Sequence, residues 1–183
     1  TRSEVLLATG KDGIFKIKTP LIHVSPNAVT PANIIRIKSQ ENGEPLNPTC
    51  IFQSSDYTSG ILWIPDEGRG LVKFTPKNSS GTIGSDGICK RYSRSDGLPS
   101  NYISDILEDN KGYLWLFTEG GLTKLDPVSE AFSTYTVKDG LPINSIGGAC
   151  KNKSGEIFFG SDLALVSFHP DSIHYNLDKP SVL

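Results

Sequence analysis

Two pairs of neighbouring acidic residues are the first candidates for chemistry in this sequence. They are Asp66 with Glu67 and Glu108 with Asp109. Glycoside hydrolases use two carboxyl groups roughly 5–10 Å apart, one as the general acid and the other as the base or nucleophile. Asp109, however, stands immediately before residues 110–112, where a turn needs a side-chain oxygen to accept its backbone amides. We therefore expect these carboxylates to serve the structure rather than catalysis.

The histidines, cysteines and glycines of the sequence also form no motif for catalysis or metal binding. The chain contains three histidines and three cysteines. None of His23, His169 and His174 stands in a nucleophile motif, and no cysteine or histidine has a neighbour at the spacing of a metal site. Gly120 and Gly121 are not followed by a helix whose dipole could bind phosphate. The sequence therefore predicts neither a catalytic centre nor a cofactor.

The composition is that of a soluble globular protein. Of 183 residues, 37% are hydrophobic and 21% are charged. The net charge of −2 provides no basic surface for nucleic acid. No apolar run approaches the roughly 20 residues of a membrane-spanning helix. Because the chain contains no methionine at all, we expect it to be a piece of a longer polypeptide.

Residues 96–127 contain three apolar runs of strand length, and turn residues bound each run. The runs are 102–109, 113–118 and 122–125, and they are separated by Gly, Asn and Asp. The middle run is apolar on both faces, with Trp115 and Phe117 on one and Leu114 and Leu116 on the other. A strand in a sheet with one solvent-exposed face would alternate apolar and polar residues, so we expect this sheet to be covered on both sides.

The same arrangement occurs three times. In each copy a glycine follows a leucine by 14 positions, and an aromatic residue stands three positions further on: Leu46, Gly60 and Trp63; Leu98, Gly112 and Trp115; Leu141, Gly155 and Phe158. The turn Asp-Gly-Leu-Pro at 96–99 recurs 43 positions later, and residues 13–17 match residues 121–125. A period of about forty to fifty residues with four strands per unit is typical of propeller blades.

We therefore predict an all-β partial propeller of antiparallel four-stranded blades. The predicted units are a partial blade at 1–40 that lacks its first strand, and blades at 46–93, 96–137 and 141–170, the last without a clear outer strand. We expect an open arc, in which the first and last units neither pair nor pack face to face. Trp63, Trp115 and Phe158 should be core residues between blades.

The cysteines and one asparagine fit the same repeat. Cys50 takes the place of Tyr102, Cys89 that of Phe132 and Cys150 that of Leu107, so each is expected to be a small buried residue. Asn152 is expected to occupy the turn position of Asn110.

These motifs resemble the two-component regulator propeller repeat. The resemblance is fullest at 96–127, good at 139–170 and partial at 46–76, which lacks Asp-Gly-Leu-Pro. It implies a non-catalytic sensor segment from the periplasmic part of an inner-membrane hybrid two-component receptor. The implied ligand is carbohydrate-derived, such as an oligosaccharide, and the implied full receptor is a homodimer. It also implies further blades and a following β-sandwich domain in the same polypeptide, with residues 171–183 beginning the connection.

Ligand contacts in such a segment would fall on loops at one end of the blades, because a rigid scaffold presents its binding residues on loops. A propeller enzyme, such as a lyase or glycan hydrolase, and a dimerisation scaffold remain alternatives. An enzyme would need histidines or paired carboxylates that converge near the propeller axis. The candidate contact residues are Asn101, Tyr102, Glu119, Asn144, Asp162, Asp66 and Arg69.

Overall fold

The structure, a computed structural model, describes residues 3–8, 14–19, 34–37, 40–41, 44–54, 60–77, 86–142, 147–161 and 164–173. Within these ranges the chain forms β-strands and short 3₁₀ turns, with no α-helix. Among the same residues no helix has the length and apolar character needed to cross a membrane. The candidates Asn144 and Asp162 and residues 174–183 lie outside the described residues.

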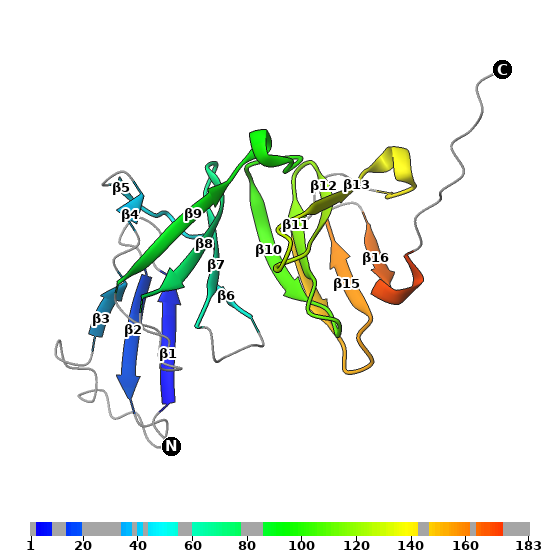
Figure 1. The fold of residues 1–183 in the computed structure, drawn as a ribbon. Coiled ribbons are helices and arrows are strands. Elements are labelled where there is room, and N and C mark those ends of the chain that lie inside the picture. The colour runs from blue at the N-terminus through cyan, green and yellow to red at the C-terminus, as the bar shows by residue number, and fades with distance from the viewer. Residues whose placement is uncertain are drawn as a thin grey trace.

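Four antiparallel sheets follow one another along the chain, and we number them as blades 1 to 4 (Figure 1). A two-stranded hairpin, β4 (Gln40–Glu41) and β5 (Glu44–Pro45), lies between blades 1 and 2 in the sequence. The strands of the blades are β1 (Ser3–Ala8), β2 (Ile14–Thr19) and β3 (Ile34–Ile37) in blade 1; β6 (Phe52–Gln53), β7 (Leu62–Asp66), β8 (Gly70–Pro76) and β9 (Gly87–Tyr92) in blade 2; β10 (Ile103–Glu108), β11 (Leu114–Thr118), β12 (Gly121–Leu125) and β13 (Phe132–Tyr135) in blade 3; and β14 (Gly148–Lys151), β15 (Ile157–Gly160) and β16 (Leu165–Phe168) in blade 4.

The fold is the partial propeller predicted from the repeat. Blades 2 and 3 have four strands in sequential order, and blades 1 and 4 have three each among the described residues. Blades 1 and 4 lie at opposite ends of the molecule in Figure 1. No strand pairing joins them within the part of the chain that the structure describes, so the sheets form the expected open arc.

Glycines at the tight turns let each third strand approach its outer neighbour. Gly70 and Gly121 begin the third strands of blades 2 and 3 with positive φ angles of 95° and 129°. A Cβ atom at Gly70 would lie 2.2 Å from the carbonyl oxygen of Tyr92, and one at Gly121 would lie 2.4 Å from that of Tyr135. Only glycine combines this backbone conformation with this clearance.

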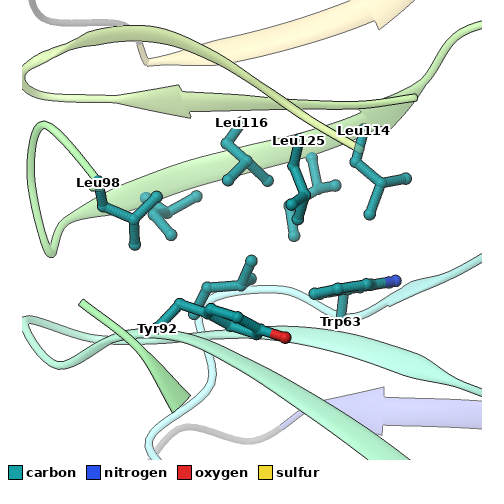
Figure 2. Packing of buried hydrophobic residues seen from close by; sticks show 9 residues of the cluster. Trp63, Tyr92, Leu98, Leu114, Leu116 and Leu125 are labelled. Carbon is teal, nitrogen blue, oxygen red and sulfur yellow. The ribbon is translucent and has the colours of Figure 1, made fainter. Parts of the chain in front are cut away.

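The hydrophobic core lies between the blades. Leu114, Leu116 and Leu125 of blade 3 pack on Trp63 and Tyr92 of blade 2, and Figure 2 shows the two layers of side chains meeting. The other face of blade 3 packs on blade 4 through another cluster. That cluster contains Trp115, Phe117, Leu122, Ile157 and Phe159. The predicted division of the middle strand between two faces is therefore confirmed.

Polar contacts also join successive blades on the side of the turn at 110–112. Glu130, in the connection before β13, forms ion pairs with Lys73 at 2.7 Å and with Lys90 of blade 2. These two contacts lower the pKa of Glu130 to about 2. Asp171 of blade 4 pairs with Lys111 of blade 3 at 2.5 Å. The two blade-to-blade contacts therefore share one arrangement. In each, an acidic residue that follows the third strand of one blade pairs with a lysine of the preceding blade.

Two expectations about small residues need correction. Cys150 is exposed, whereas Cys50 and Cys89 are half-buried, because the outward side of β14 faces away from blade 3. Asn152 occupies the position of Asp109 rather than that of Asn110. Its Oδ1 accepts the amides of Ser154 and Glu156 at 3.0 Å each, two and four residues on, as Asp109 accepts those of its own turn.

Candidate ligand-binding face

One end of blades 2 and 3 is formed by the β7–β8 turn, the loop before β10 and the β11–β12 turn. The loop starts with the 3₁₀ turn η3 (Arg94–Asp96), which ends at Gly97 with a φ of 109°. The Asp96 carboxylate accepts the backbone N–H and the hydroxyl of Ser93 at 2.8 and 2.9 Å. These hydrogen bonds lower the pKa of Asp96. Asp139 caps the next copy of the turn in the same way, so both aspartates of the Asp-Gly-Leu-Pro motif have structural roles.

Asn101 joins the loops of two blades. Its backbone carbonyl accepts the amide of Gly70 in blade 2 at 3.1 Å. Its side-chain Oδ1 accepts the amide of Arg94 at 3.0 Å. The Asn101 side chain therefore holds the loop that carries Tyr102.

Tyr102 is the exposed aromatic residue of this face. Its side chain is 52% exposed. The ring lies against the β7–β8 turn, since a Cβ atom at Gly68 would be 3.2 Å from the phenol oxygen. The backbone is fixed on both sides, because the Tyr102 amide donates to Ser100 Oγ at 3.1 Å and its carbonyl accepts the amide of Glu119 at 3.3 Å. Tyr102 is thus a half-exposed residue whose backbone is held in place and whose phenol end contacts the neighbouring blade.

Glu119 and Arg69 belong to the two turns that contact Tyr102. Glu119 is exposed, and its backbone hydrogen bond places it next to Tyr102. Arg69 follows Gly68 in the turn that the phenol contacts, and its side chain is 36% exposed. The face therefore offers an aromatic ring, a carboxylate and a guanidinium from two adjacent blades.

Asp66 lies beneath this surface instead of on it. Its side chain is 0% exposed, and its two oxygens form ion pairs of 2.8 Å with Arg69 and Arg91. Oδ1 also accepts the backbone amide of Asn47 at 2.7 Å. Asp66 thereby orients Arg69, which reaches the surface. The structure brings five of the seven candidate residues into one region and assigns Asp66 an internal position in it.

Sequence reasoning missed Arg91 and Gly68. Arg91 lies on the outer strand β9, opposite Val72, and it reaches Asp66 from there. No motif marks this pair, because it depends on the register of β9. The sequence Asp-Glu-Gly-Arg is typical of a turn, and Gly68 in this turn has a φ of 68°. Its contact with Tyr102, however, joins two blades, so the local sequence does not reveal it.

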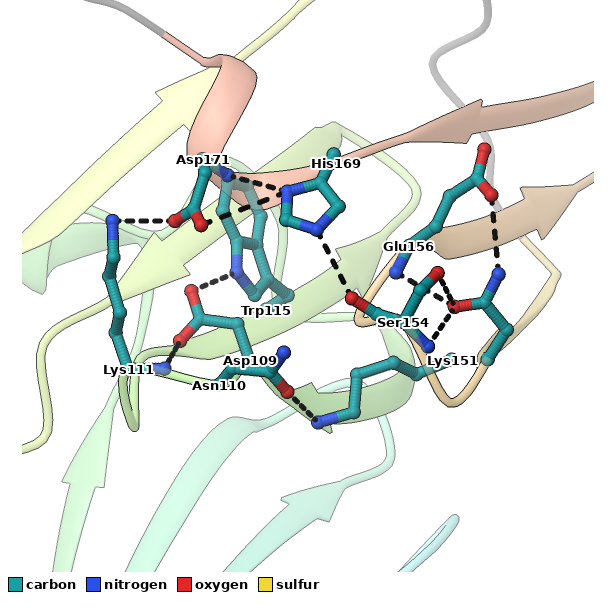
Figure 3. A network of polar contacts seen from close by, with 10 residues as sticks. Asp109, Asn110, Lys111, Trp115, Lys151, Ser154, Glu156, His169 and Asp171 are labelled. Atoms are coloured by element: carbon teal, nitrogen blue, oxygen red, sulfur yellow. Dashed lines mark hydrogen bonds and ion pairs between the residues drawn. The ribbon is translucent and has the colours of Figure 1, made fainter.

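The opposite end of the blades carries a polar network that contains the three residue types of a catalytic triad (Figure 3). His169 Nε2 lies 3.3 Å from the carbonyl oxygen of Ser154, and His169 Nδ1 lies 3.9 Å from Asp171 Oδ2. The Ser154 hydroxyl, however, donates to Asn152 Oδ1 at 2.7 Å. Because the imidazole meets the serine carbonyl and not its hydroxyl, this arrangement cannot activate a nucleophile.

Neither proposed carboxylate pair is arranged for acid–base catalysis. Asp109 is buried, and its oxygens accept the amides of Lys111 and Tyr113 and the indole N–H of Trp115. Asp66 is held by two arginines as described above. Among the described residues no group of histidine, cysteine and acidic side chains could hold a metal ion.

A cleft of about 800 Å³ lies between β13, the turn at residues 138–142 and the edge of blade 4. Its walls combine apolar side chains, such as Tyr135 and Phe168, with polar ones, such as Lys138 and Asp139. In the seam between blades 2 and 3, Phe132 of the fourth strand packs on Tyr92 with ring centroids 5.6 Å apart. Between blades 2 and 3, a side chain of the outer strand therefore fills the position that corresponds to this cleft. For this reason the cleft is not a candidate ligand site.

One copy of the repeat matches a known family. Residues 97–120 match the two component regulator propeller family. This confirms the resemblance that the motifs at 96–127 indicate, and the matched residues include the Gly-Leu-Pro turn, Tyr102 and Glu119.

Relatives that contain similar segments are much longer than this chain. A stretch of 90 residues is 30% identical to histidine kinase P4 of Formosa agariphila, and it covers 48% of this chain and 7% of that kinase. Two extracellular domains of hybrid two-component systems from B. thetaiotaomicron share the fold, with TM-scores of 0.63 and 0.62 and identities of 17% and 15%. Each similarity covers 91% of this chain, and 21% and 22% of the respective relatives.

Proposed function

We propose that this chain is a non-catalytic sensor segment of a two-component receptor and that its loop face around Tyr102 binds a carbohydrate-derived ligand. The family match at residues 97–120 and the names of the relatives support the signalling role. In this proposal the segment lies in the periplasm and the kinase lies on the cytoplasmic side of the membrane. The full receptor is a homodimer.

The position of Tyr102 is the observation that carries the ligand proposal. An aromatic ring that is half exposed and carried by a hydrogen-bonded backbone can stack on the C–H groups of a sugar, since the ring face is negative. Glu119 can accept hydrogen bonds from sugar hydroxyls, and Arg69 can donate them. The three groups come from two blades, so a bound oligosaccharide would span the seam between blades 2 and 3. Asn144 and Asp162 remain candidates at the equivalent loops of blade 4.

The test is a binding screen with a panel of neutral and acidic oligosaccharides, followed by variants at Tyr102. For a ligand found in the screen, Tyr102→Ala should weaken binding about tenfold or more, which corresponds to about 1.4 kcal/mol. Tyr102→Phe should bind within about threefold of the parent, because stacking needs the ring and not the hydroxyl.

Val128→Ala is the matched control, because Val128 is 91% exposed and lies at the other end of blade 3. It should leave the affinity unchanged. If Tyr102→Ala binds as well as the parent, the loop face around Tyr102 is not the ligand site. If the mixture contains cleaved oligosaccharide after incubation with the pure protein, the enzyme alternative replaces the sensor.

A further inference from the structure

Arg91 belongs to the outer strand of blade 2, but its guanidinium lies at the turn between β7 and β8. Its Nη1 donates a hydrogen bond of 3.0 Å to the backbone carbonyl of Arg69 in that turn. Its Nη2 lies 2.8 Å from Oδ2 of Asp66, the last residue of β7. One guanidinium therefore holds the turn at two points, and the planar fork of an arginine suits two such contacts.

Asp66 depends on Arg91 because its carboxylate is buried. The side chain is 0% exposed, and its Oδ1 accepts hydrogen bonds from the Arg69 side chain at 2.8 Å and from the Asn47 amide at 2.7 Å. Among the described residues, Oδ2 has no partner with hydrogen-bond geometry, so the ion pair with Arg91 compensates its burial. Asp66 thus links the two arginines, with one on each carboxylate oxygen.

The turn that Arg91 holds also supports the loop that carries Tyr102. The amide of Gly70 donates a hydrogen bond of 3.1 Å to the backbone carbonyl of Asn101 in that loop. The phenol oxygen of Tyr102 would lie 3.2 Å from a Cβ atom at Gly68. A displacement of the turn would therefore move groups that support the loop of the neighbouring blade.

We propose that Arg91 is a positioning residue of the ligand site. From the outer strand it fixes the β7–β8 turn and, through Asp66, the guanidinium of Arg69. The inference rests on the proposed function, because it assigns Arg91 a role in the same site. A turn that is ordered before the ligand arrives loses less entropy on binding, so Arg91 contributes to the affinity without touching the ligand.

Hydrogen exchange tests the effect on the turn without a ligand. The amides of Arg69 and Gly70 donate hydrogen bonds of 2.8 and 3.1 Å to backbone carbonyls. In Arg91→Met both amides should exchange at least about tenfold faster than in the parent, because the turn opens more often. The amide of Gly112, which closes the β10–β11 turn with a hydrogen bond of 3.2 Å, is the internal reference and should keep its rate.

Affinity for the oligosaccharide that binds best in the panel tests the effect on the ligand site. Arg91→Met should weaken binding about tenfold, since binding then has to order the turn. Arg91→Lys should weaken it only about threefold, because it keeps a positive charge opposite Asp66 but one nitrogen cannot make both contacts. Lys90→Met is the matched control and should bind like the parent. It removes a cation from the same strand, and its ion pair with Glu130 lies on the other face of β9.

A double-variant cycle separates positioning from a general loss of stability. Because Arg91 acts through Arg69, Arg91→Met should weaken binding by less than about twofold in an Arg69→Met background. A general loss of folded protein would weaken binding equally in both backgrounds. Thermal melts identify the variants that are folded at the assay temperature, and Arg91→Lys replaces Arg91→Met in every comparison if the latter does not fold.

Three outcomes would overturn the proposal. The first is unchanged exchange of the Arg69 and Gly70 amides in Arg91→Met. The second is the same loss of affinity in both backgrounds of the cycle. The third is an Arg91→Met variant that binds the oligosaccharide like the parent. In that third case Tyr102→Ala distinguishes the two proposals: if it weakens binding, only the role of Arg91 fails, and if it does not, the proposed function fails as well.

Discussion

The indole N–H of Trp115 donates a hydrogen bond of 2.9 Å to Oδ2 of the buried Asp109. Oδ1 of the same carboxylate accepts the amides of Lys111 and Tyr113, which closes the turn between β10 and β11. One aspartate therefore connects the turn to the largest core side chain of blade 3. Blade 4 has Asn152 and Phe158 at these two positions, and there the asparagine closes the turn without an indole partner.

This pairing predicts non-additive stability effects at positions 109 and 115. Asp109→Asn should destabilise the protein by about 2 kcal/mol, because the buried indole N–H loses its acceptor. Adding Trp115→Phe to Asp109→Asn reproduces the pair found in blade 4 and removes the unpaired donor. The double variant should therefore be more stable than the sum of the two single changes predicts, by about 1 kcal/mol. Urea denaturation of the four proteins measures the difference, and strict additivity would contradict the pairing.

Trp115→Ala should destabilise the protein strongly, by about 3–5 kcal/mol as for other large aromatic truncations in cores. Trp115 is 0% exposed, and its ring contacts those of Tyr135 and Phe168 with centroids 6.0 and 4.9 Å away. A thermal melt compares the variant with its parent, and Val128→Ala serves as the exposed control. A variant that melts at the parent temperature would show that this face of blade 3 is not packed on blade 4.

The ion pairs of Glu130 predict a loss of stability in acid. The lysines hold the pKa of Glu130 at about 2 in the folded protein, below its unfolded value near 4.3. A depressed carboxyl pKa contributes stability above the unfolded pKa, and this contribution is lost as the pH falls from about 5 to 2. We expect about 0.5–1 kcal/mol, because solvent screens these partly exposed pairs.

Glu130→Gln should remove this part of the acid dependence, and Glu119→Gln should leave it intact. Denaturant midpoints at pH 7, 5, 4 and 3 measure both variants. The prediction is wrong if Glu130→Gln and the parent lose stability in parallel over this range.

Two glycine substitutions separate steric overlap from backbone strain. Gly121→Ala should cost more than about 2 kcal/mol, because its Cβ would lie 2.4 Å from the carbonyl oxygen of Tyr135 at a φ of 129°. Gly140 has a φ of 93°, but a Cβ there would have no neighbour within 4 Å. Gly140→Ala should therefore cost only about 1 kcal/mol, the strain of the left-handed backbone alone. Equal losses in the two variants would show that the close approach of β13 to Gly121 has no energetic consequence.

The sequence alone was sufficient for the architecture because the repeat is encoded locally. Three copies of the same leucine, glycine and aromatic spacing predict strands, turns and their order without knowledge of distant contacts. The apolar pattern of residues 113–118 likewise predicts a strand covered on both faces, and the structure confirms the division between Trp115 and Leu116. The role of Asp109 as a turn acceptor follows from its immediate neighbours for the same reason.

The position of each side chain relative to the other blades was decided by the tertiary structure. Asp66 reads as a loop residue, yet Arg69 and Arg91 hold it beneath the surface, and Arg91 reaches it only through the register of β8 and β9. Cys150 has the local pattern of a core residue, but it is exposed because no described blade covers its side of β14. Local spacing determines which residues share a sheet face; whether that face is buried depends on the sheet packed against it, and its sequence lies elsewhere in the chain.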